Sequence, residues 1–329
     1  MIQLYYGDYM NVEDIIVEKE LRVVFMGTPD FAVPVLEGLI SNYPVKAIVT
    51  QPDKLVGRKG ILTAPPIKRV GSEHNILVLQ PKKIKEEYNE ILALEPDLIV
   101  TCAYGQIIPK ELLDYPKYGC INVHASLLPK LRGGAPIHRC VMEGHSETGI
   151  TIMYMAEGMD DGDIICQSKI PILDSDTASS IHDKLSILGR DLLLSVLPSI
   201  LSGTNSRTKQ DTSLVTYGFN IKPEDEKIDF SKTRREVFNK IRGLYSFPGA
   251  YCYLEEKRLK IWQAYESDNH FTDCIDGEIT AIYKDGFGVK VSNGEIICTL
   301  VQMEGKSKTK ASDFVNGIGK DNLVGKILS

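Results

Sequence analysis

The sequence predicts an α/β protein in two parts: a mostly parallel sheet covered by helices, followed by a small β-barrel. Three observations predict it. Between residues 21 and 201, short apolar runs alternate with stretches of helical periodicity, which is typical of a parallel sheet covered on both faces. Residues 202–213 hold only glycine, polar and charged residues and no apolar side chain. Such a composition is typical of a linker. Beyond residue 250, short alternating runs follow one another with little helix, which indicates a barrel.

Each strand of the first part is a short apolar or β-branched run. The expected strands are 21–26, 45–49, 76–79, 98–101, 120–123, 151–154 and 164–165. Apolar residues at helical spacing predict helices over 31–39, 84–93 and 183–201. In sheets of this kind ligands bind beyond the carboxyl ends of the strands, so functional residues are expected there.

The second part begins with one expected helix over residues 231–243 and continues as strands. The expected strands are 250–254, 258–265, 275–283, 287–291 and 296–301. Short strands in a segment of this length suggest an OB-like barrel. The domain boundaries that follow are an N-terminal extension at 1–20, a sheet domain at 21–205, a linker at 206–225 and a barrel domain at 226–329.

Composition excludes several classes of protein. With 43% hydrophobic and 25% charged residues the chain is neither disordered nor a coiled-coil rod, and no apolar run approaches the roughly 18 residues that would span a bilayer. The net charge of −6 argues against a general nucleic-acid binder, although a local basic patch remains compatible with it.

Seven cysteines without a CxxC pair disfavour zinc-ribbon and thioredoxin sites and favour a reducing compartment. The acidic N-terminus lacks a secretory pattern, so we expect a cytoplasmic protein.

Asn122 and His124 are the strongest candidates for chemistry. They lie two residues apart at the carboxyl end of an expected buried strand, so their side chains emerge on the same side. The amide can donate a hydrogen bond to a developing oxyanion, and the imidazole can do the same or move a proton. The pattern alone is equally compatible with a loop-capping Asn and a semi-buried structural His.

Two glycine-flanked loops are weaker candidates. Residues 158–163, Gly-Met-Asp-Asp-Gly-Asp, form either a tight turn or an acidic active-site loop. Residues 51–60 are expected to form a long loop without regular structure, in which Lys54, Arg58 and Lys59 can clasp phosphates or simply face solvent. The turn after residue 26 lacks the second and third glycines of a dinucleotide-binding motif, so a nicotinamide or flavin site is not expected.

These segments together resemble the methionyl-tRNA formyltransferases. The resemblance rests on Val24–Pro34, the 51–58 loop, Tyr104–Pro109, Asn122–Ile137 and Gly158–Asp163, and it extends from about Leu21 to the C-terminus. It implies a Rossmann-like catalytic domain, a linker and an OB-like C-terminal domain. Residues 1–20 have no counterpart in the family.

The resemblance also implies roles for individual residues. Asn122, His124 and Asp160 match the catalytic residues of the family, and Arg58 matches an arginine of its tRNA-binding loop, with Lys54 and Lys59 beside it. The folate-side loop is matched by Ser126, Leu127, Leu128 and Pro129.

The implied reaction is formyl transfer from 10-formyltetrahydrofolate to the amino group of initiator methionyl-tRNA, which releases tetrahydrofolate and needs no metal. We expect a monomer that does not bind membranes. Two alternatives remain open: the same chemistry on an amino-sugar nucleotide, and a nucleic-acid-binding module without enzymatic activity. The basic loop and the C-terminal domain favour tRNA over a sugar, and the intact catalytic residues favour an enzyme.

Overall fold

The computed structural model of the protein describes residues 21–57 and 60–329 and divides the chain into two compact units. Unit 1 holds the described residues up to His124 together with Ile150–Ser168 and Ser186–Gln210. Unit 2 holds Ala125–Gly149, Lys169–Leu185 and Asp211–Ser329. Two segments inside the predicted sheet domain, 125–149 and 169–185, therefore cluster with the C-terminal barrel. The predicted extension at residues 1–20 lies outside the described residues.

Unit 1 is built on a seven-stranded sheet of order β5-β2-β1-β6-β7-β8-β9. Strands β5, β2, β1, β6 and β7 pair in parallel, whereas β8 runs antiparallel to β7. Strand β1 is apolar because helices cover both faces of the sheet, and every residue from Val23 to Met26 is fully buried. The prediction of a mostly parallel sheet is confirmed. The bounds are β1 Val23–Gly27, β2 Val45–Val49, β5 Leu77–Leu79, β6 Leu98–Cys102, β7 Cys120–His124, β8 Glu147–Tyr154 and β9 Ile164–Pro171.

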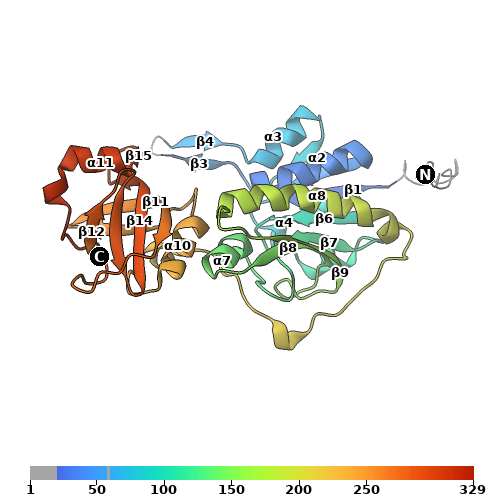
Figure 1. The fold of residues 1–329 in the computed structure, drawn as a ribbon. Coiled ribbons are helices and arrows are strands. Elements are labelled where there is room, and N and C mark those ends of the chain that lie inside the picture. The colour runs from blue at the N-terminus through green and yellow to red at the C-terminus, as the bar shows by residue number, and fades with distance from the viewer. Residues whose placement is uncertain (1–20, 58–59) are drawn as a thin grey trace, which may run out of the picture. The chain divides into compact units, whose positions relative to one another are not determined.

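The helices of unit 1 pack closely on this sheet and on one another. Figure 1 shows α2 (Val33–Asn42) beside α8 (Ala178–Leu201). Glycines make the approach close: a Cβ on Gly38 would lie 2.6 Å from Cγ of Arg190, and one on Gly189 would lie 2.9 Å from Cγ1 of Val123. The remaining short helices are η1 Asp30–Ala32, α3 Pro66–Glu73, α4 Ile84–Glu87, α5 Asn89–Leu92 and α6 Lys110–Asp114.

Two sequence-based expectations for unit 1 need correction. The single helix expected over 84–93 is two short helices, because the carbonyl of Tyr88 accepts from both Ile91 and Leu92 and starts a new turn there. The 51–60 segment is not structureless. It opens a hairpin of β3 Lys54–Val56 and β4 Ile61–Thr63, and Gly57 and Gly60 supply the positive φ angles at its turn, 73° and 59°.

Unit 2 contains an antiparallel barrel sheet of order β10-β11-β14-β13-β12, with β15 paired to β14. Alternating residues of its strands, such as Phe287, Val289 and Val291, fill the core. The predicted OB-like barrel is confirmed. Its strands are β10 Tyr251–Leu254, β11 Lys257–Ser267, β12 Ile279–Ile282, β13 Phe287–Val291, β14 Gly294–Met303 and β15 Thr309–Lys310.

Helix α10 (Arg234–Gly243) covers part of the barrel and packs against α7 (Pro136–Met142). It begins with a capping box, in which Thr233 and Glu236 exchange side-chain and backbone hydrogen bonds. Unit 2 also contains α9 Pro223–Glu226, α11 Ala311–Ile318, η2 Thr212–Leu214 and η3 Lys320–Asn322. Within the described residues, no helix combines the length and apolarity needed to cross a membrane.

Candidate active site

Strand β7 places Asn122 and His124 at the carboxyl end of the parallel part of the sheet. Asn122 lies opposite Thr101 of β6 and Met153 of β8, and His124 lies opposite Thr151. His124 is buried, with 6% of its surface exposed, whereas Asn122 is half-buried. The two polar side chains share one side of an otherwise apolar strand, as their spacing predicts.

Thr101 orients the carboxamide of Asn122. Its hydroxyl donates to Oδ1 of Asn122 over 2.8 Å. Thr101 itself is buried, with 2% of its surface exposed. Because Oδ1 is engaged as an acceptor on the β6 side, the Nδ2 donors point away from β6. The sequence interpretation missed Thr101. The available signal was a hydroxyl within the buried run Leu98–Cys102, since a buried hydroxyl needs a partner.

Asp160 approaches the ring of His124. Its Oδ2 lies 3.7 Å from Nδ1 of His124, and its side chain is 19% exposed. The backbone of Asp160 is in the left-handed region, with φ of 49°, a conformation that Asp adopts more readily than most residues. The carboxylate of Asp160 therefore faces the imidazole of His124 across the site.

Two further residues hold the Asp160 loop in place. Nε2 of Gln210 donates to the carbonyls of Asp160 and Gly162 over 2.7 and 2.8 Å. A Cβ on Gly162 would lie 2.0 Å from the carbonyl oxygen of Tyr154, so only glycine fits there without displacement. Gln210 was not identified from the sequence, because nothing in the apolar-poor 202–213 segment indicates that it returns to this loop.

The predicted folate-side residues lie together in unit 2. Ser126, Leu127, Leu128 and Pro129 line one wall of a pocket of about 480 Å³, within the usual range for small-molecule sites. The hydroxyl of Ser126 donates to the carbonyl of Lys130 over 2.6 Å and closes the turn. The rest of the pocket is lined by Lys130, Leu131, His145, Ser146, Glu147, Thr148 and Leu214.

Of the three predicted tRNA-contacting residues, only Lys54 is described. It lies on the exposed β3 strand of the hairpin. Arg58 and Lys59 lie outside the described residues. The hairpin carries exposed apolar side chains as well, with Leu55 and Leu62 at 71% and 65% exposure.

Comparison with known proteins identifies both parts of the chain. The formyl transferase family profile matches residues 21–197, and the profile of the formyl transferase C-terminal domain matches residues 220–319. The chain is 48% identical to the methionyl-tRNA formyltransferase of Lysinibacillus sphaericus over 307 residues, covering 92% of this chain and 98% of that protein. It is 50% identical to that of Bacillus subtilis over 300 residues, covering 90% and 94%.

Among solved structures, the chain is similar to an N-formyltransferase from Helicobacter canadensis in complex with folinic acid and dTDP-3-aminofucose. The TM-score is 0.65 and the identity 21%, over 84% of this chain and 98% of that one. At this identity the likeness shows a shared fold. It does not select between the two amine substrates.

Proposed function

The chain belongs to the methionyl-tRNA formyltransferase family, and on that premise we propose that it transfers the formyl group of 10-formyltetrahydrofolate to the amino group of initiator methionyl-tRNA. The observation that carries the proposal is the placement of Asp160 against the ring of His124, 3.7 Å away, beside Asn122 on the same strand. That placement matches the chemistry that formyl transfer requires.

The reaction forms a bond between the α-amino nitrogen of methionine and the formyl carbon, and it breaks the bond from that carbon to N10 of the folate. Negative charge develops on the formyl oxygen during the attack. The Nδ2 donors of Asn122, directed by Thr101, and a ring N–H of His124 stabilise this charge. One donor of this kind is typically worth about 3–4 kcal/mol.

Asp160 supports His124 and does not contact the formyl group in this scheme. Its carboxylate lies beside Nδ1 of His124 and orients the ring. The amino group loses a proton as the new bond forms, and N10 gains one as it leaves, directly or through water. Proton transfer and charge stabilisation are sufficient for the step, so no metal is required.

The pocket lined by Ser126, Leu127, Leu128 and Pro129 is proposed to receive the folate. Its mixed apolar and polar lining suits an aromatic ring system that also carries hydrogen-bonding groups. The donor is consumed as a co-substrate and leaves as tetrahydrofolate.

Lys54 on the hairpin is proposed to contact tRNA together with Arg58 and Lys59, and the C-terminal domain at 226–329 is proposed to add affinity for it. The proposed division is a catalytic domain at 21–205, a linker at 206–225 and this C-terminal domain. The enzyme is proposed to act as a monomer in the cytoplasm, where translation begins.

The alternative acceptor is an amino-sugar nucleotide, since a structurally similar formyltransferase was solved with one. The test is a comparison of three acceptors at equal concentration: charged initiator tRNA, charged elongator tRNA and an amino-sugar nucleotide. The proposal expects transfer to be fastest with initiator methionyl-tRNA. Faster transfer to the sugar nucleotide would refute it.

A further inference from the structure

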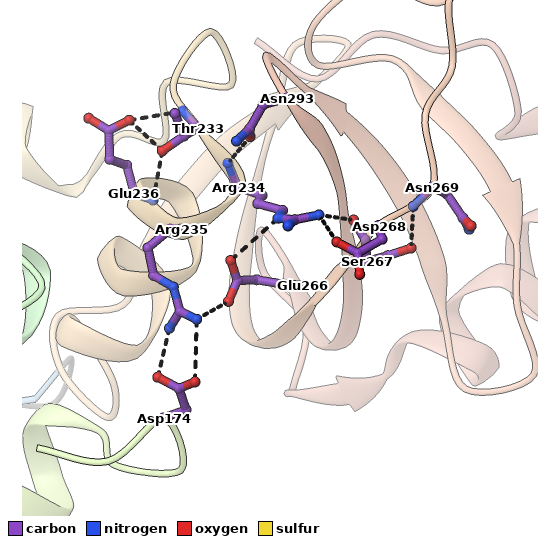
Figure 2. Close-up of polar contacts among 10 residues, drawn as sticks. All are labelled: Asp174, Thr233, Arg234, Arg235, Glu236, Glu266, Ser267, Asp268, Asn269 and Asn293. Carbon is purple, nitrogen blue, oxygen red and sulfur yellow. Dashed lines mark hydrogen bonds and ion pairs between the residues drawn. The ribbon is translucent and has the colours of Figure 1, made fainter.

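The arginines at the start of α10 look in the sequence like a nucleic-acid contact, but carboxylates surround them in the structure. Figure 2 shows Arg235 between Asp174 and Glu266, with nitrogen–oxygen distances of 2.7 Å to each. Arg234 pairs with Asp268 and lies 3.8 Å from Glu266. Three carboxylates thus neutralise two guanidinium groups, and the start of α10 offers little positive field to a phosphate.

The other two cations of α10 are also held internally. Nζ of Lys240 donates to the carbonyl of Lys227 over 2.8 Å. Arg242 is 7% exposed and donates to Asn239 and to the carbonyls of Leu173 and Asp176. Burial lowers the pKa of the Arg242 side chain. The basic sequence of α10 therefore serves the packing of unit 2.

A different pair of cations in the same unit lies against one aromatic ring. Nζ of Lys308, in the connection between β14 and β15, lies 3.4 Å from the ring centroid of Trp262. Nζ of Lys260, two residues before Trp262 on β11, lies 5.3 Å from it. The loop before β10 completes the cluster. The carbonyl of Pro248 accepts a hydrogen bond from Nζ of Lys260, and the ring centroid of Tyr245 lies 5.5 Å from Nζ of Lys308.

This pair lacks the neutralisation seen at α10. In the described part of the chain, no carboxylate oxygen lies within 4.0 Å of the ammonium group of Lys260 or Lys308, nor of exposed Lys306 and Lys310 nearby in sequence. Partial burial lowers the pKa of Lys308, and the nearby positive charge of Lys260 lowers it further by a smaller amount. Two like charges on one patch of a protein surface are stabilised by an anion that lies between them.

We infer that Lys260 and Lys308 form a phosphate-binding site for the tRNA backbone on the barrel, and that the arginines of α10 do not. The inference rests on the proposed function for the identity of the polyanion. Exposed Phe247, at 78% exposure in the adjoining loop, adds an aromatic surface of the kind that nucleic-acid-binding barrels present. Lys306 and Lys310 extend the positive charge along the β14–β15 connection.

The test compares two double substitutions in the full chain. Lys260→Met with Lys308→Met removes both charges but keeps apolar side chains of similar length over Trp262. The matched control, Lys284→Met with Lys320→Met, removes two exposed lysines from the same barrel. The probe is unacylated initiator tRNA, and its Kd is measured at several salt concentrations, with the melting temperature of each variant.

We expect the variant with both Lys260 and Lys308 replaced by Met to bind tRNA about tenfold more weakly. The slope of log K against log salt should shrink by about 1 to 2, because binding with fewer phosphate contacts releases fewer counterions. The control should stay within about twofold of wild type. Lys260→Arg with Lys308→Arg should restore binding, which separates loss of charge from loss of folding.

Equal effects of the test and control variants would overturn the inference, as would loss of binding in the Arg variant despite a wild-type melting temperature. Failure of the phosphate site and failure of the proposed function give different results. If the wild-type chain formylates methionyl-tRNA and the test variant keeps its Kd and KM, only the phosphate site is wrong. If wild type transfers no formyl group to methionyl-tRNA, the proposed function is wrong.

Discussion

The hydroxyl of Thr101 donates to Oδ1 of Asn122 over 2.8 Å between neighbouring parallel strands. This bond determines which end of the carboxamide faces away from β6, and so links a buried residue of one strand to the proposed oxyanion donor of the next. Thr101 is a positioning residue in this account, because it acts only through Asn122.

Replacing Thr101 with Val should therefore lower kcat about tenfold, equivalent to about 1.4 kcal/mol, because the carboxamide loses the partner that orients it. The KM for the folate donor should change little. Thr101→Ser keeps the hydroxyl and should retain kcat within about threefold. The measurement is steady-state formyl transfer by the three proteins. If the Ser and Val variants lost activity equally, packing would matter there and the hydrogen bond would not.

Gln210 should matter for turnover, because it donates to two carbonyls of the Asp160 loop. Gln210→Ala leaves both acceptors without this donor and allows Asp160 to move from His124. We expect kcat to fall about fivefold to tenfold, a loss typical of one or two hydrogen bonds. The matched control is Gln263→Ala, an exposed glutamine on β11. A Gln210 variant as active as this control would show that the loop holds its shape without the side chain.

The Arg235 pairs should contribute to stability in a pH-dependent way. Hydrogen bonds from Arg235 hold the pKa of the Asp174 carboxyl below its usual value, so the stabilisation is present above the ordinary pKa of Asp and is lost as the pH falls. Arg235→Met should lower the melting temperature by about 2–4 °C at pH 7. The difference from wild type should shrink towards pH 3. A pH-independent difference measured by calorimetry would assign the loss to packing of the Arg235 stem.

The elements that the sequence predicted best are those whose apolar runs lie in the middle of a sheet. The expected strands at 45–49 and 287–291 have the observed bounds, because buried apolar residues mark each of them. These are Ala47, Ile48 and Val49 in the first strand and alternate residues from Phe287 to Val291 in the second. The hairpin at 54–63 was missed for the opposite reason. The residues of β3 and β4 are all exposed, so no burial pattern distinguishes these two short strands from a loop.

The residues of the candidate site divide in a similar way into local and long-range features. The strand spacing of Asn122 and His124 could be read from the sequence because it is local. The approach of Asp160 to His124 was implied by family resemblance, while the contacts of Thr101 and Gln210 were not predicted, since they join segments 21 and 50 residues apart. The basic residues of α10 illustrate the limit most clearly. Four basic residues stand close together in its sequence, and only the fold brings Asp174, Glu266 and Asp268 to the arginines.

The measurement that tests the central claim most directly is kcat/KM for formyl transfer from 10-formyltetrahydrofolate to initiator methionyl-tRNA. It is made with the full chain and with Asn122→Ala, His124→Ala and Asp160→Ala, each checked for a wild-type melting temperature. The account predicts transfer by wild type and a loss of about 100-fold or more in each variant. No transfer by wild type, or near-normal transfer by a folded His124→Ala variant, would contradict it.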